Sequence, residues 1–243
     1  MDDLRKTAPI TVRNMDNSEV EVHIKIIFGY VTTDDTGKSI IVMDSISVDS
    51  NSSARWIRPY PVRFVLGGGE SQTVRLVATP SPGLADGEYW CRVLITSYPR
   101  GITTSSKKTS TKGAMTFAYE IGLPIYFRHG KISTGLDQHD FSLKKIDNEL
   151  EVHLDLERTG NASFNGSQMI RIRNKEGEVV RTVESENLVV FNKYKLKEKV
   201  KVSDLPAGMY NIELEILSKR KDISAKYLLS SPPLRLSGKI ELP

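Results

Sequence analysis

Residues 115–128 read Met115-Thr-Phe-Ala-Tyr-Glu-Ile-Gly-Leu-Pro-Ile-Tyr-Phe-Arg128. Every odd position in this segment carries an apolar side chain, from Met115 to Phe127. Because successive side chains of a β-strand point to opposite faces, this period predicts one strand of roughly 45 Å with a hydrophobic stripe along a single face. Strands typically hold about five or six residues, so this one must extend beyond its sheet or change partners. Pro124 has no backbone N–H to donate, which favours an edge position or a change of sheet near that residue.

Short alternating segments also make up most of the remaining chain, separated by Gly, Pro, Asn and Asp. Such spacing is typical of β-sandwiches and barrels, and helical periodicity is nearly absent. The sequence therefore predicts an all-β fold. Three pairs of neighbouring segments are expected to form antiparallel pairs: 10–13 with 20–26, 62–66 with 72–77, and 169–173 with 178–181.

The chain length predicts two domains. A chain of 243 residues exceeds the usual size of one β-sandwich and suits two domains of roughly 100–130 residues each. The turn-rich stretch 129–135 is the expected linker, which divides the chain into domains 1–130 and 131–243. The second of these contains about seven short strand segments, as a β-sandwich does.

Composition and charge exclude several classes of protein. The chain is 39% hydrophobic and 26% charged, as expected for a globular protein with a real core. No run of about 18 apolar residues occurs, which excludes a transmembrane helix. The net charge of +4 is mild, and the basic residues of the loop 99–113 lie among Ser, Thr and Gly. Without interleaved aromatic residues they predict a solvated loop and no nucleic-acid partner.

The amino-terminal residues Met1–Lys6 are charged rather than apolar, so they do not form a secretory signal peptide. Two interpretations remain open. The protein is cytoplasmic, or the chain is a mature or trimmed form with an added Met1.

Residues that could carry catalysis or bind a metal do not converge in the sequence. Asp137, His139 and Asp140 lie close together, but an exposed turn explains them equally well and no second histidine follows at a ligand spacing. Gly67-Gly68-Gly69 is expected to be a turn, because no helix or lysine follows it as in a phosphate-binding loop. The single cysteine, Cys91, lies in an apolar run and predicts a buried thiol. We therefore expect no enzyme activity, no cofactor and no metal.

The first half of the chain resembles the amino-terminal domain of periplasmic pilus-assembly chaperones, a family with two immunoglobulin-like domains. Three stretches carry the resemblance: Ala8 to Asn14; Pro61 to Leu66 with Gly69 to Leu76; and Asp86-Gly87-Glu88-Tyr89 with Ile121 to Arg128. Residues 131–243 are similar to the family only as a β-sandwich with an Arg-x-Gly-Asn turn. The resemblance implies two immunoglobulin-like β-sandwich domains in tandem and a periplasmic location, with the signal peptide removed.

The resemblance also implies a function. Such a chaperone lends an alternating hydrophobic strand to a pilus subunit that lacks its last strand, and it cooperates with an outer-membrane usher. The side chains so donated would be Met115, Phe117, Tyr119 and Ile121, while Leu123 and Ile125 are expected in the core. The same exposed edge can also pair with a second copy of the chain.

Two further features follow from the family resemblance. Glu88 and Arg128 match residues whose ion pair sets the angle between the domains. The family also holds the subunit's terminal carboxylate with a basic residue four positions before that arginine, and here the position is Pro124. Arg5 and Lys6 are the substitutes that the sequence offers for a second basic anchor.

A structural or adhesive β-sandwich module of a cell-surface or filament assembly is the alternative function. In that case the stripe at 115–127 is an inner core strand. Exposure of the first side chains of the stripe separates the two readings, because a binding strand leaves them open at an edge and a core strand buries them.

Overall fold

The computed structural model describes residues 1–44, 50–100 and 117–243. It confirms the all-β fold, since the described residues form fifteen strands and a single 3₁₀ turn, η1 (Ala225–Tyr227). No helix in these ranges is long and apolar enough to cross a membrane. The strands are β1 (Thr7–Arg13), β2 (Val20–Thr33), β3 (Ser39–Asp44), β4 (Ile57–Tyr60), β5 (Arg63–Leu66), β6 (Ser71–Ala78), β7 (Gly87–Pro99), β8 (Tyr119–His129), β9 (Thr134–Ile146), β10 (Glu149–Gly160), β11 (Phe164–Arg173), β12 (Val179–Val190), β13 (Lys193–Lys201), β14 (Gly208–Leu217) and β15 (Leu234–Leu242).

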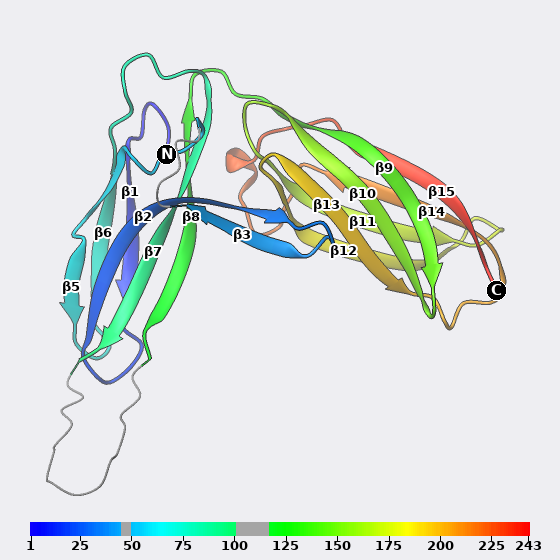
Figure 1. Ribbon diagram of the computed structural model, residues 1–243, viewed down its shortest axis with the longest axis horizontal. Helices are drawn as coiled ribbons and strands as arrows, with labels where there is room; N and C mark the ends of the chain where they lie inside the picture. Colours follow the sequence, from blue (N-terminus) through cyan, green and yellow to red (C-terminus); the bar gives the residue numbers. More distant parts are fainter. Residues whose placement is uncertain (45–49, 101–116) are drawn as a thin grey trace, which may run out of the picture. The chain divides into compact units, whose positions relative to one another are not determined.

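The chain folds into two compact units (Figure 1). The first contains residues 1–30 and 43–130, and the second contains residues 31–42 and 131–243. Residues 31–42 come from the tip of the β2–β3 hairpin and contact the edge of β13. There the Thr32 hydroxyl donates to the Lys193 carbonyl at 2.9 Å, and the Lys195 amide donates to the Thr33 hydroxyl at 2.6 Å.

The first unit is built from two sheets. One has the strand order β1-β6-β4 and the other has the order β3-β2-β7-β8, with β5 added to β2. Apolar side chains from both sheets form one core, including Val22, Leu76, Cys91, Val93 and Phe127. Pro59 lies in β4, at an edge of its sheet, where its missing N–H breaks no inner ladder.

The second unit repeats this arrangement. Its sheets have the orders β13-β10-β9 and β12-β11-β14-β15. The alternating residues of β10, β11 and β14 supply most of its core, with Leu154, Ile170 and Ile212 fully or almost fully buried. The β11–β12 pair confirms the hairpin predicted around residues 174–177.

Both units have the immunoglobulin-like plan. In each, a strand pairs with the second-last strand of the unit, which in turn pairs with the last: β2-β7-β8 in the first and β11-β14-β15 in the second. The third residue of each second-last strand is a tyrosine whose hydroxyl donates to a backbone carbonyl four residues upstream. Tyr89 donates to Ala85 at 2.8 Å and Tyr210 donates to Pro206 at 2.7 Å. This tyrosine corner is a hallmark of the immunoglobulin fold, so the predicted fold class is confirmed.

Two of the expected antiparallel pairs were wrong. Residues 10–13 lie in β1, which pairs with β6, whereas 20–26 lie in β2, which pairs with β7 in the opposite sheet. Likewise β5 pairs with β2 while β6 pairs with β1, so 62–66 and 72–77 do not pair with each other. A turn signal shows that the chain reverses, but it does not show whether the next strand stays in the same layer.

Asn14 connects the two loops, 14–19 and 67–70, in which the chain passes from one sheet to the other. Its side-chain amide donates to the carbonyls of Ser18, Leu66 and Gly67 at 2.7, 3.3 and 3.0 Å, and its backbone N–H donates to the Glu70 carbonyl at 2.9 Å. One buried polar side chain thus satisfies backbone groups of both crossing loops.

Candidate partner-binding edge

Strand β8 lies at the end of its sheet (Figure 1), paired with β7 on one side only. It begins at Tyr119 rather than at residue 115, and Met115 falls outside the described residues. Within the described ranges no named strand pairs with its other edge. The amino-terminal residues reach that edge near its end, where the Met1 amine donates to the Tyr126 carbonyl at 2.7 Å and the Arg128 amide donates to the Met1 carbonyl at 3.0 Å. The stretch from Tyr119 to Pro124 therefore forms an open edge.

The hydrophobic stripe is exposed along this open stretch and becomes buried toward the end of the strand. Phe117, Tyr119 and Ile121 are 62, 69 and 60% exposed. Ile125 packs partly buried against the core, and Phe127 is completely buried. The stripe therefore has two parts on one face: a solvent-exposed first part and a second part, at Ile125 and Phe127, that belongs to the sandwich core, while Leu123 between them is half-buried.

The backbone groups of the even residues of β8 face the open edge. Tyr126 and Arg128 hydrogen-bond to Met1 on the side away from β7. The β7–β8 register is uninterrupted from Gly87–His129 to Ser97–Tyr119. Since the N–H and C=O of one residue point to the same neighbour and those of the next residue point to the opposite side, the groups of Glu120, Gly122 and Pro124 also face the open edge.

Glu88 and Arg128 lie directly opposite each other on β7 and β8. The Arg128 Nε atom donates to the Glu88 carboxylate at 2.8 Å, and the Glu88 side chain is completely buried. A buried carboxylate requires such a partner because it has lost its hydration. The structure thus brings together the two residues that the family resemblance pairs.

Arg92 was missed by the sequence reasoning. It is the cross-strand neighbour of Pro124, where the family resemblance leads one to expect a basic residue. Its guanidinium donates to the Gly122 carbonyl at 2.8 Å, and the residue is only 8% exposed. The available signal was a lone arginine within the apolar run Tyr89 to Ile95, which is an unusual position for a charge. Arg5 and Lys6, the proposed substitutes, are exposed.

Cys91 and the polar residues near 139 have ordinary structural surroundings. Cys91 is fully buried, and desolvation raises the pKa of its thiol to about 11. His139 lies in β9 with its Nε2 atom 3.9 Å from the Glu157 carboxylate. Across the described ranges, no group of three or more His, Cys, Asp or Glu side chains converges in the way that a metal requires.

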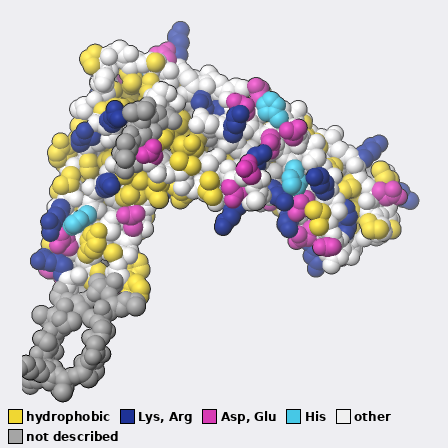
Figure 2. Space-filling model, viewed as in Figure 1, with side chains coloured by type: hydrophobic (Ala, Val, Ile, Leu, Met, Phe, Trp, Pro, Cys, Tyr) yellow, Lys and Arg dark blue, Asp and Glu magenta, His cyan; other side chains and the backbone are white. Residues whose placement is uncertain are grey.

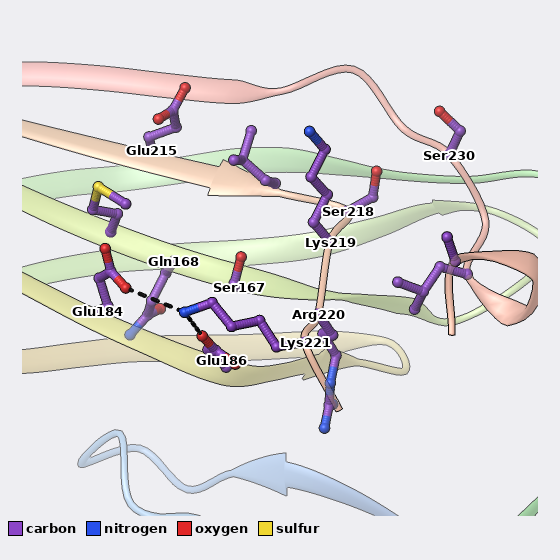
Figure 3. Close-up of a pocket in the computed structure, with 14 residues that line it drawn as sticks. Ser167, Gln168, Glu184, Glu186, Glu215, Ser218, Lys219, Arg220, Lys221 and Ser230 are labelled. Atoms are coloured by element: carbon purple, nitrogen blue, oxygen red, sulfur yellow. Dashed lines mark ion pairs between the residues drawn. The ribbon is translucent and has the colours of Figure 1, made fainter. Parts of the chain in front are cut away.

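The second unit has a cavity of about 670 Å³ beside the segment 218–230 (Figure 3). Its lining includes the apolar side chains of Met169 and Leu217 and charged side chains from β12 and from that segment. Lys221 forms ion pairs with Glu184 and Glu186, as Figure 3 shows, and Arg220 pairs with Asp222. Arg220 and Lys221 are thus paired with carboxylates within the fold.

Charged side chains also alternate over the sheet β13-β10-β9 of the second unit (Figure 2). Lys195 pairs with Asp155 at 3.1 Å, Lys197 with Glu151 at 3.3 Å, and Lys199 with both Glu149 and Glu151. These three lysines of the edge strand β13 are thus paired with acidic residues of β10. Lysines on an edge strand oppose pairing with another chain.

Comparison with known proteins gives structural relatives only. No family model matches the sequence, and no curated protein matches it significantly. The chain resembles a chain of the CsuC–CsuE chaperone–tip adhesion subunit pre-assembly complex from archaic Csu pili of Acinetobacter baumannii, at 13% identity and TM-score 0.45, with 98% of this chain and 93% of that chain covered.

Two further solved structures have similar scores. The E. coli chaperone DraB has 14% identity and TM-score 0.43, covering 97% of this chain and 92% of its own. The Salmonella enterica SafA pilin in complex with the SafB chaperone has 12% identity and TM-score 0.43, covering 97% and 90%. These three solved structures are described as a chaperone alone or a chaperone with an adhesin or pilin subunit.

Proposed function

We propose that this protein is a chaperone that binds an extended or incomplete β-sheet partner along the open edge of β8. The observation that carries the proposal is the exposure of Phe117, Tyr119 and Ile121 at alternate positions beside that edge. An added strand would satisfy unpaired backbone groups, and the three side chains would enter a groove of the partner. Met115 would extend the same stripe.

The resemblance of the first half of the sequence to pilus-assembly chaperones specifies the partner. We propose pilus or fimbrial subunits as the substrates, the periplasm as the location, and an outer-membrane usher as a further partner. Residues 1–130 and 131–243 would be the two domains. The Glu88–Arg128 pair would fix the orientation of the chain where it leaves the first domain.

The exposed stripe is large enough to matter energetically. Burying an apolar side chain of this size contributes about 2 kcal/mol, so three contribute about 6 kcal/mol before the cost of ordering is subtracted. Backbone hydrogen bonds to the edge would add to this value. Removing one side chain of the three should therefore weaken binding without abolishing the fold.

The substitution Phe117→Glu tests the proposal. Because residue 117 is exposed, the variant should fold with an unchanged melting temperature, and it should lose co-purification with any pilin-like protein encoded beside its gene. Met15→Glu is the matched control, since Met15 is 81% exposed and lies in a turn outside β8. Undiminished partner recovery by Phe117→Glu would refute the docking role of this edge.

The alternative is a structural module that assembles with copies of itself. It is favoured by a second apolar edge in the same sheet, where Ile41 and Met43 of β3 are 51 and 53% exposed. Contacts between the edges of successive copies would build an open filament. Sedimentation velocity of the purified chain distinguishes the two functions, because the module would polymerise without any partner.

A further inference from the structure

The open edge of β8 is interrupted just beyond the exposed stripe. We infer that Arg92 and Pro124 together form an edge stop, which ends backbone pairing of a docked strand at Gly122 and so sets its register. This inference rests on the proposed function of β8 and deepens it, because it names the residues that decide how far the partner strand can pair.

The first half of the edge stop is a hydrogen bond. The Gly122 carbonyl faces the open edge, yet the Arg92 guanidinium already donates to it at 2.8 Å. Arg92 reaches this carbonyl across the face of β8, because Gly122 has no side chain. A Cβ at residue 122 would lie 3.3 Å from the Arg92 Nε atom and 3.4 Å from its Nη2 atom. The guanidinium thus lies tightly against the position that a Cβ atom would take.

The second half of the edge stop is Pro124. Its backbone nitrogen is directed toward the open edge but carries no hydrogen. A partner strand that continued past Gly122 would therefore meet a carbonyl that already accepts one hydrogen bond, with the Arg92 guanidinium beside it, and then a missing donor. Beyond them, the Tyr126 carbonyl and the Arg128 amide are engaged by Met1.

The backbone groups and the side chains of β8 limit a docked strand at the same place. The last strongly exposed side chain of the stripe is Ile121, and the last free donor of the edge is the N–H of Gly122. A partner shifted by two residues toward the end of β8 would lose both kinds of contact. Burial of the stripe already limits the register of a docked strand, and the physical stop limits it at the same residue, so the partner has a single preferred position.

The edge stop can be tested in the complex with the pilin-like protein. Amide hydrogen exchange followed by NMR should show the Glu120 and Gly122 amides slowed about tenfold or more on binding. The double variant Arg92→Met with Pro124→Val frees the carbonyl and supplies an N–H while keeping apolar bulk. In its complex, the new amide at residue 124 should also be slowed about tenfold.

A second measurement needs no partner. Lengthening an unprotected edge promotes pairing between copies, so the double variant should dimerise about tenfold more strongly than the parent in sedimentation equilibrium. Arg100→Met is the control, because Arg100 follows β7 and pairs with Glu19 rather than with β8. Circular dichroism of each variant verifies that it is folded.

The outcomes separate the two proposals. If the parent chain forms no complex while the double variant dimerises more strongly, the proposed function fails and the edge stop stands as protection against self-pairing. If the parent complex forms but the amide at residue 124 in the double variant exchanges freely, the edge stop is overturned. Unchanged dimerisation of the double variant also contradicts it.

Discussion

At the scale of the residue, the buried charges of the first unit have the clearest energetic consequence. Removing the partner of a buried carboxylate typically costs about 3 kcal/mol or more. Arg128→Met should therefore lower the free energy of unfolding by about that amount, because Glu88 remains in the interior. Urea denaturation measures it.

A double-mutant cycle is the control for this prediction. Glu88→Gln combined with Arg128→Met should be less destabilised than the sum of the two single variants, since the amide carries no charge to be left unpaired. Additive effects would show that the 2.8 Å contact contributes no coupling energy.

Cys91 gives a second prediction at the residue scale. Burial raises the pKa of its thiol to about 11, so only about 0.1% would be thiolate at pH 8 even without steric protection. We expect a thiol reagent at pH 8 to modify the folded chain at least about a hundredfold more slowly than the urea-unfolded chain. Rapid modification of the folded chain would contradict the buried position.

At the scale of the element, the ladder between β10 and β13 predicts a pH dependence. Hydrogen bonds from His153, and then from Lys197 and Lys199, lower the pKa of Glu151 from 4.5 to about 2. Since the folded-state pKa lies below the unfolded one, the unfolded chain takes up the proton first as the pH falls. Stability contributed by Glu151 is therefore complete above about pH 5 and lost progressively toward pH 2.

Thermal melts between pH 2 and pH 6 measure this dependence. Glu151→Gln should reduce the decline in melting temperature over that range. Glu176→Gln, which alters an exposed carboxylate in the turn between β11 and β12, is the matched control and should leave the decline unchanged. If the melting temperatures of Glu151→Gln and of the parent chain declined equally with falling pH, the contacts of Glu151 would not contribute to the pH dependence.

The side chains of β8 differ in burial although the alternation of the strand is continuous. Its alternation is continuous from residue 115 to residue 127, yet Tyr119 is 69% exposed and Phe127 is fully buried. Period two assigns side chains to a face, but the cover over that face is supplied by strands distant in sequence. Phe127 is covered by Trp56, with the two ring centres 5.0 Å apart.

At the scale of the whole molecule, the two units share an immunoglobulin-like plan without visible sequence repetition. The shared features are the strand orders and the tyrosine corners at Tyr89 and Tyr210. The corners were readable as Gly-x-Tyr at residues 87–89 and 208–210. The same local contact thus recurs at the start of the second-last strand in two units of different sequence.

The sequence by itself determined the fold class, the alternating strands and the faces on which apolar side chains lie, because these depend on local period and turn chemistry. The tertiary structure decided which strands pair, as β1 and β2 show by lying in opposite sheets. It also decided that Phe117, Tyr119 and Ile121 stay exposed, and that Arg92 reaches Gly122. These features depend on contacts between residues far apart in the chain, which no local pattern encodes.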